Sequence, residues 1–453
     1  MTRVAAPPDI GWPVWRLAWV IVFGAFASGL DTSLVNVGLS TIGADLDAAL
    51  PVVQWVATGY LLALAVSLPL AGWLGRRVGV GQLWLAALVA FTVASVGCAA
   101  APDIGSLIGL RVVQGLAGGL LIPAGQTVLG RAVGARRLGR VMATLGIAVT
   151  VGPALGPVAG GLLLAEASWR WLFFVNLPIG VVGFLLGLRY VPRDATRAGL
   201  PLDWRALGYA SAGLPLLVYG LTAVATDPLA VRAVAPAAAG VVMLWTFVVR
   251  TRRSRHPLLD LALFRNRVFA AATVASGLSG MLMFGSGLLF ALYFSLGRHD
   301  SALESGLHLL GLGGATALAL PLTGRLVDRY GGGVVSMAGA GLAVVATVPF
   351  AVLPVTASPV VVHALLAVVG VAVALAAVPP GIAAYKTVDA GQLPDATTTV
   401  NIVQRVGGAL GGALFTLILA GAGFHAAFWA MAAVAVVALG ATGRLAREGG
   451  PVS

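Results

Sequence analysis

The sequence predicts an all-α membrane protein that crosses a bilayer many times. Of its 453 residues, 59% are hydrophobic and only 10% are charged, whereas soluble domains carry about 25% charged residues. A soluble fold of this length has too little interior to bury so much apolar surface. A helix needs about 20 mostly apolar residues to span a bilayer. Fourteen segments meet this requirement, at 16–38, 52–74, 82–101, 105–127, 140–164, 170–190, 206–225, 231–250, 268–295, 304–324, 334–355, 359–384, 398–421 and 424–443.

The distribution of basic residues supports this count. If the N-terminus is inside, the inner loops and tails hold 23 of the 28 Lys and Arg residues, and the outer loops hold Arg170, Arg232 and Arg298. Arg111 and Arg405 lie within segments. Basic residues collect in cytoplasmic loops, and one missed segment would invert every later loop. We therefore expect both termini in the cytoplasm. The net charge of +12 is explained by this topology and does not indicate nucleic-acid binding.

An internal repeat divides the chain. Residues 68–81 (LPLAGWLGRRVGVG) match residues 320–333 (LPLTGRLVDRYGGG) at eight of fourteen positions, at an offset of 252. GPALGP at 152–157 matches GGALGG at 407–412, at an offset of 255. Both copies have the same orientation, which resembles the two six-helix halves of major facilitator transporters. We expect a first half at 1–190, an inserted helix pair with linkers at 191–267, a second half at 268–443 and a cytoplasmic tail at 444–453.

The repeated loop resembles the superfamily signature that follows the second helix. Its glycines allow a tight turn. In the first copy Arg76 stands where the signature has an aspartate, so we expect the acid–base latch to be absent there. The second copy keeps the acid–base latch, as Asp328 and Arg329. The residues assigned to this gating motif are Gly72, Arg77 and Gly79 in the first copy, and Gly324, Asp328, Arg329 and Gly331 in the second.

An acid and an arginine lie at similar depth in the first and fourth segments. Asp31 is about 12 Å from the outer end of its segment and Arg111 about 10 Å from the outer end of its own. A charge in lipid normally has a partner or a function. Burial favours the protonated acid and a nearby arginine favours the ionised one, so the pair could titrate near physiological pH. We expect Asp31 and Arg111 to couple transport to protons; a static ion pair is the alternative.

The fifth segment has small residues at a four-residue spacing. Gly152, Gly156 and Gly160 form a face on which another helix can pack closely, and Pro153 and Pro157 each remove a backbone hydrogen bond. The string GPALGPVAGG resembles the antiporter signature of the superfamily. We expect this helix to act as a gate, with a rigid glycine-rich packing helix as the alternative.

The whole chain resembles the fourteen-helix drug:proton antiporter family. The resemblance rests on LDTSLVNV in the first segment, WRWLFFVNLPIG at 169–180 and the inserted helix pair. It implies a proton-coupled exporter of small lipophilic or cationic compounds in the bacterial cytoplasmic membrane, working by alternating access. Its expected partners are substrate, protons and the bilayer, and it is expected to be monomeric and to need no cofactor or metal.

Several polar residues are candidates for the substrate cavity. Glu304 and His308 share one helical face near the outer interface, where solvated rim residues are the alternative. Asn401, Gln404 and Arg405 lie near the start of the thirteenth segment, and they either line the cavity or pack against neighbouring helices. The full set of candidates is Asn36, Gln114, Glu304, His308, Asn401, Gln404 and Arg405.

Other classes of function have less support in the sequence. A membrane enzyme would need a nucleophile or a metal site, but the five histidines are scattered and no metal-binding motif is present. The single cysteine, Cys98, cannot form an internal disulfide. A receptor shows no distinctive signal, and no phosphate-binding loop surrounds the only lysine, Lys386. A carrier of the same fold for one metabolite, as exporter, importer or uniporter, remains the main alternative.

The charge pattern predicts the side of each loop. Residues 189–205 and 250–267 should be cytoplasmic and residues 225–231 external. A cysteine placed at Asp227 should therefore react with a membrane-impermeant reagent added outside intact cells. Labelling from the cytoplasmic side alone would contradict the fourteen-segment topology.

Overall fold

The computed structural model describes residues 10–134, 137–193, 201–226, 231–254, 257–300, 302–354 and 357–448, and these are helical with short connections and no strand. The side chain of Pro157, the labelling position Asp227, and the tail residues 449–453 lie outside this described part. The helices of the first half are α1 (Trp12–Asp45), α2 (Leu50–Val78), α3 (Val80–Ala99), α4 (Ile104–Val133), α5 (Leu138–Glu166), α6 (Trp171–Phe174) and α7 (Asn176–Tyr190).

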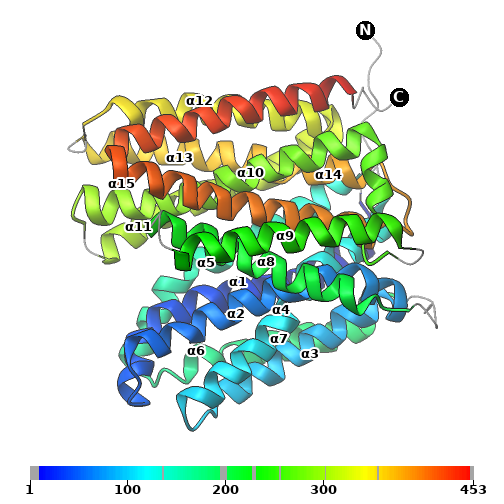
Figure 1. Cartoon of the computed structure of the whole chain (residues 1–453), viewed down its shortest axis with the longest axis horizontal. Coiled ribbons are helices and arrows are strands. Elements are labelled where there is room, and N and C mark those ends of the chain that lie inside the picture. Colours follow the sequence, from blue (N-terminus) through cyan, green and yellow to red (C-terminus); the bar gives the residue numbers. More distant parts are fainter. Residues whose placement is uncertain are drawn as a thin grey trace.

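Two helices connect this half to the second, α8 (Trp204–Thr226) and α9 (Val231–Arg253). The second half contains η2 (Leu261–Arg265), α10 (Arg267–Leu292), the π-helical turn η3 (Tyr293–Gly297), α11 (Ala302–Tyr330), α12 (Gly332–Val352), α13 (Pro359–Ala377), α14 (Pro379–Tyr385) and α15 (Leu393–Glu448). Figure 1 shows the first half in blue to teal, α8 and α9 in green, and the second half in light green (α10 and α11) through yellow to red.

Twelve of the described helical segments are long and apolar enough to cross a membrane. The last of them, α15, contains two helices that meet at Gly423, whose backbone is non-helical with φ of 79°. The all-helical membrane fold is therefore confirmed. The count of fourteen spans, which also requires α8 to cross the bilayer, stays a prediction.

Local sequence explains where the helices begin and end. Gly79 and Gly331 both have positive φ, 88° and 85°, a conformation that favours glycine over residues with a Cβ. Each lies at the joint between two helices, α2 and α3 in the first half and α11 and α12 in the second. They are equivalent positions of the repeat at the offset of 252. The signature glycines are thus the residues that turn the chain back into the bilayer.

The α8–α9 pair packs against both halves. α8 contacts α9, α2 and α15, and the Ser211 hydroxyl donates to the Val66 carbonyl oxygen at 2.9 Å. At the base of the pair, Arg250 Nε donates to Asp203 Oδ2 at 2.9 Å. Burial raises the pKa of Asp203, but the hydrogen bonds from the Ala206 N–H and from Arg250 outweigh it and hold that pKa below its usual value. The domain boundaries expected from the sequence stay a prediction.

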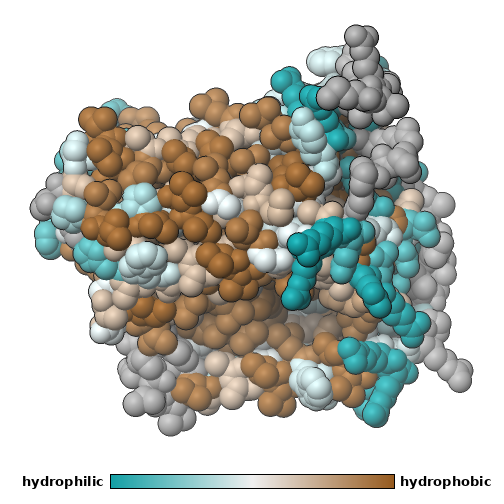
Figure 2. All heavy atoms as spheres, turned by 90° about the horizontal axis from the view of Figure 1, so that it is seen from above, coloured by the Kyte–Doolittle hydropathy of each residue, from teal (hydrophilic) through white to brown (hydrophobic). Residues whose placement is uncertain are grey.

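Most of the protein surface is apolar, as a lipid-facing surface requires. Trp204, Trp245 and Leu318 are among the large apolar side chains that are mostly exposed. Figure 2 shows brown apolar residues over the body of the molecule and the more strongly hydrophilic residues gathered mainly at one end. Burying about 100 Å² of apolar area contributes about 2.5 kcal/mol, so such a surface is stable only in contact with lipid chains.

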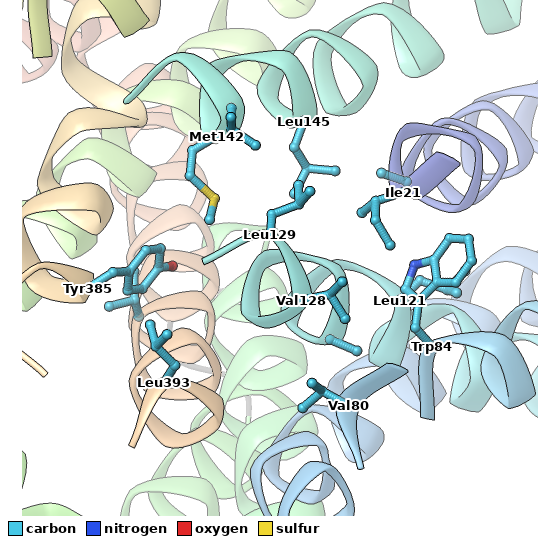
Figure 3. Close-up of a cluster of buried hydrophobic side chains, with 14 of the residues drawn as sticks. Ile21, Val80, Trp84, Leu121, Val128, Leu129, Met142, Leu145, Tyr385 and Leu393 are labelled. Carbon is cyan, nitrogen blue, oxygen red and sulfur yellow. The ribbon is translucent and has the colours of Figure 1, made fainter. Parts of the chain in front are cut away.

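The buried core is continuous between the halves at one end only. One cluster combines residues of α1, α3, α4 and α5 with Tyr385 of α14 and Leu393 of α15, and Figure 3 shows these two side chains approaching Leu129 and Met142. A second cluster belongs to the second half and a third to the first half. The shared cluster lies at the end where α5 and α15 begin, so the halves are closed together there.

Helices α1 and α5 pack closely at the glycines, as the four-residue spacing predicts. A Cβ on Gly156 would lie 2.3 Å from the Ser33 side chain, and one on Gly152 would lie 2.9 Å from the Leu30 nitrogen. In the second half, Gly407 and Gly411 approach α10 in the same way. The gating role of Gly152, Pro153, Gly156, Pro157 and Gly160 stays a prediction.

This packing predicts a position-specific effect of size within α5. Gly156→Leu should destabilise the protein by about 1–3 kcal/mol, the usual range for overpacking, because Ser33 lies where the side chain must go. Gly161→Leu is the matched control, because no atom lies within 4 Å of its Cβ position. Thermal unfolding in detergent measures both. Equal midpoints for the two variants would contradict the close α1–α5 contact.

Candidate functional site

A buried ion pair joins α1 to α4. Asp31 and Arg111 are 0% and 1% exposed, and the Arg111 guanidinium donates to Asp31 Oδ2 at 2.5 Å. Helical phase explains the meeting, because both side chains point into the interior of the first half. An unpaired charge at this position would be strongly destabilising.

Two amides complete the ligation of the Asp31 carboxylate. Gln114 Nε2 and Asn176 Nδ2 donate to Asp31 Oδ1 at 3.0 and 2.8 Å. Gln114 Oε1 in turn accepts from Arg111 at 2.7 Å, and Asn176 Nδ2 also donates to the Ser95 hydroxyl at 3.0 Å. The carboxylate is therefore held by α4 and α7 together, and each of its oxygens has a donor.

Aromatic rings and the backbone fix the arginine. The guanidinium lies over the Tyr60 ring, 4.1 Å from its centroid, and Arg111 Nε donates to the Val56 carbonyl oxygen at 3.0 Å. The Tyr60 hydroxyl lies 3.0 Å from the Ser28 hydroxyl. Arg111 is thus held by α2 through Val56 and Tyr60, and a change in the charge of Asp31 would be felt by α1, α2, α4 and α7.

The second-half acid of the repeated loop contacts the opposite half. Asp328, near the end of α11, accepts from the Gly139 N–H at 2.8 Å and from Arg140 Nε at 3.0 Å. Both donors lie in the first turn of α5, where a carboxylate is stabilised by the helix dipole. The expected pairing with Arg329 is wrong, because Arg329 lies over the Tyr330 ring. Burial lowers the pKa of Lys386, and Asp328 partly offsets this.

The first-half loop also forms an ion pair between halves, which corrects the expectation that its latch is absent. Arg76 pairs with Asp395 of α15, and its other terminal nitrogen donates to the Leu258 carbonyl oxygen at 3.2 Å. Asp395 lies in the first turn of α15 and is 4% exposed. Sequence reasoning considered only the loop, whereas the acid is 319 residues away.

The two latches are related by the internal repeat with their charges exchanged. Arg76 is equivalent to Asp328 at the offset of 252, and Arg140 is equivalent to Asp395 at the offset of 255. In one latch the loop supplies the acid and the helix the base, and in the other the roles are reversed. The N-termini of α5 and α15 still each have a carboxylate beside them, Asp328 and Asp395, which the helix dipole favours.

A cavity lies between the halves, on the bilayer side of the latches. Its wall comes from α4, α5, α10, α11, α13, α14 and α15, and of the predicted cavity residues it contains Asn401, Gln404 and Arg405. Asn401 Nδ2 donates to Gln126 Oε1 at 2.6 Å, and the Tyr385 hydroxyl donates to the same oxygen at 3.3 Å. No acidic side chain lines this cavity.

The other predicted cavity residues lie elsewhere. Gln114 belongs to the buried Asp31 cluster, and Asn36 is exposed on α1. Glu304 is exposed near the start of α11. His308 stacks on Phe294 and lies 2.9 Å from a His363 nitrogen. None of these four lines the cavity between the halves.

Comparison with known proteins decides the family. The sequence model described as Major Facilitator Superfamily matches residues 21–412. The chain belongs to this superfamily.

Relatives and solved structures of the superfamily agree with this assignment. The chain is 36% identical over 416 residues to a protein of Mycobacterium tuberculosis named multidrug resistance protein B homolog, covering 91% of this chain and 77% of the relative. It is 31% identical to the putative multidrug resistance protein MdtD of Escherichia fergusonii, covering 70% and 67%.

The solved structures are more distant in sequence. The human organic anion transporter MFSD10 has a TM-score of 0.68 at 16% identity, covering 95% of this chain and 100% of that one. The proton:xylose symporter XylE has a TM-score of 0.65 at 13% identity, covering 94% of each chain. At these identities the likeness shows the major facilitator fold alone.

Three residues of this superfamily member were missed by sequence reasoning. Asn176 lies within the string WRWLFFVNLPIG, where a lone amide in an apolar helix start was a usable signal. Asp395 is the acid that could have been sought for Arg76. Gln126 lies on α4 twelve residues beyond Gln114, which at 3.6 residues per turn places it about a third of a turn round the helix, facing the cavity between the halves instead of the Asp31 cluster.

Exchanging the charges of Arg76 and Asp395 should restore the latch that either charge reversal alone disrupts. Arg76→Asp and Asp395→Arg should each weaken closure by about 1–3 kcal/mol, because like charges then face each other in a partly buried site. The double variant should recover most of the lost transport, which a double-mutant cycle at matched expression measures.

Arg325→Asp provides the matched control. Arg325 is an exposed arginine near the C-terminal end of α11 and belongs to neither latch. It should leave transport close to that of the unmodified protein. A double variant no better than the worse single variant would show that the pair does not hold the halves together.

Proposed function

We propose that this chain is a proton-coupled antiporter that exports small lipophilic compounds, drugs and antibiotics among them, across the bacterial cytoplasmic membrane. In this proposal fourteen helices span the bilayer, both termini are cytoplasmic and the monomer is the working unit. The names of its relatives support export of drugs. The charge pattern of the loops supports the orientation.

The Asp31 cluster is the observation that carries the proposal. Asp31 is a fully buried acid inside a membrane helix, and such residues in transporters mark proton or substrate pathways. Its ligands come from two other helices. Protonation removes the charge that attracts Arg111, so one proton changes the forces among α1, α4 and α7.

The latches supply the conformational part of the cycle. Asp328 and Arg76 both join the halves at the end where α5 and α15 begin, which our topology places in the cytoplasm. Thr127 and Thr397 add a hydrogen bond of 2.9 Å between α4 and α15 at the same end. The cavity cannot open to the cytoplasm until these contacts separate. Rocking of one half against the other is the motion that separates them.

A carrier for one specific metabolite is the alternative with the same fold. It would use the same latches and the same buried acid. The cavity favours the broader substrate range, because most of its lining is apolar and apolar contacts discriminate weakly between similar compounds. Transport of a panel of unrelated lipophilic compounds separates the two possibilities.

Substitution of Asp31 tests the coupling. Asp31→Asn keeps the shape and polarity of the side chain but cannot carry a negative charge. In proteoliposomes it should lower proton-driven export at least tenfold, equivalent to about 1.4 kcal/mol. Exchange of labelled for unlabelled substrate, which needs no net proton movement, should persist. Substrate-induced proton release from the purified protein should disappear.

Asp45→Asn is the matched control, because Asp45 lies at the end of the same helix and pairs with Arg170 outside the cluster. It should retain coupling. A static ion pair at Asp31 predicts a different result, in which the variant loses thermal stability. A stable Asp31→Asn protein that still exchanges protons for substrate at the normal rate would exclude Asp31 as the coupling site.

A further inference from the structure

An arginine without a partner lies in the wall of the cavity between the halves. Arg405 projects from α15 and lines the cavity with Gln404 and Asn401. The other buried arginine of a membrane helix, Arg111, has a carboxylate at 2.5 Å. Arg405 makes no hydrogen bond or ion pair with any residue of the described part of the chain. Its guanidinium nitrogens nevertheless keep some solvent-accessible surface. Its donors are therefore open to the cavity.

The cavity contains no negative charge to balance this cation. No aspartate or glutamate is among its lining residues, and Asp31 is fully engaged by Arg111, Gln114 and Asn176. An uncompensated charge within a membrane protein is strongly unfavourable. A bound anion would supply the missing counter-charge, whereas a bound cation would add a second positive charge to the site.

The polar network beside Arg405 is oriented to present donors. Asn401 Nδ2 donates to the Thr397 carbonyl oxygen at 2.7 Å, which fixes the direction of its amide because a carbonyl can only accept. The same nitrogen donates to Gln126 Oε1. Gln126 therefore turns its oxygen to Asn401 and Tyr385, and its Nε2 has no hydrogen-bond partner among the described residues and is open to the cavity. Arg405 and Gln126 both offer N–H groups to an acceptor.

The remaining wall is mostly apolar, and the hydroxyls of Thr150 and Thr316 within it donate to backbone carbonyl oxygens. Met142, Leu145, Met283, Phe284 and Leu320 surround the polar side of the cavity. The site thus combines one cationic, donor-rich patch with an apolar chamber. A ligand that matches it has an apolar body and one acidic group.

We propose that Arg405, assisted by Gln126, binds the acidic group of an amphipathic organic anion, so that the exported compounds include aromatic or aliphatic carboxylates rather than cations. This inference rests on the proposed function and names its substrate class. The resemblance to drug:proton antiporters also implied cationic cargo, but Glu304, the acid among the predicted cavity residues, lies outside the cavity. At about 6 Å and an effective dielectric constant near 20, two unit charges change a binding constant by roughly 100-fold.

A matched series of ligands tests the proposal. Binding of 1-naphthaleneacetate, 1-naphthaleneacetamide and 1-naphthylethylamine to the purified protein is measured by calorimetry. The three share an apolar body and differ in charge. The carboxylate should bind about 10- to 100-fold more tightly than the amine, with the amide between them. Binding of the carboxylate no tighter than that of the amine, including no binding at all, would overturn the proposal.

Variants assign the preference to the residue. Arg405→Gln should abolish the preference for the carboxylate, and Arg405→Lys should keep most of it because the charge remains. Arg444→Gln is the control, since it removes the same charge from an exposed position in the second helix of α15. If Arg405→Gln is unstable, the ligand series on the unmodified protein and on Arg405→Lys still decides. A preference unchanged in a stable Arg405→Gln protein would also overturn the proposal.

The outcome is separable from that of the proposed function. Asp31→Asn should retain the preference for the carboxylate in equilibrium binding while losing proton-driven export. If proteoliposomes show no proton-driven export of any compound, the proposed function fails whatever the ligand preference. If export occurs but cations are bound better than anions, only the present inference fails.

Discussion

The structure depends on the requirement that charge inside a lipid bilayer be balanced locally, because no water is there to solvate it. The chain meets this requirement at Asp31, whose carboxylate receives Arg111 and two amides. Arg405 is the cavity-lining arginine that the described chain leaves without a counter-charge. The balanced Asp31–Arg111 pair is thus buried within the first half, whereas the unbalanced Arg405 faces the cavity between the halves. That difference separates a group suited to proton exchange from one suited to binding.

Close helix contact is the second condition on which the fold depends. Lipid gives helices no hydrophobic reason to associate, so packing and polar contacts must hold them together. Glycines supply the packing at Gly156 against Ser33 and at Gly407 against the Gly277 carbonyl oxygen. Glycines hold the equivalent helix pairs together in both halves, α1 with α5 and α10 with α15. The internal repeat is therefore visible in the close approach of the helix backbones as well as in the sequence. The halves meet through the shared apolar cluster at one end and through the polar latches and the Thr127–Thr397 hydrogen bond beside it.

The sequence was most informative where one residue type has one physical meaning. Apolar length predicted the membrane helices, and depth along two segments predicted that Asp31 and Arg111 meet. It was least informative where partners are distant in the chain. Asp395 could not be assigned to Arg76 across 319 residues without knowing that α15 begins beside α2. Arg140 was overlooked in favour of Arg329, which adjoins Asp328 in sequence but not in the ion pair. Gln126 was missed because an amide in a helix says nothing of which oxygen or nitrogen it presents.

The exchange of charge between the two latches has a consequence for the history of the chain. A charge-reversing substitution at Arg76 or Asp395 alone sets like charges against each other, and a neutral one leaves the partner's charge unpaired, so neither position can change alone without loss. The two positions should therefore covary among relatives, as aspartate with arginine or arginine with aspartate. A chimera that joins the first half of this protein to the second half of a relative with the opposite arrangement should close poorly, even though every helix of the hybrid is intact. Compatibility between the halves is thus recorded in one pair of residues at the border between them.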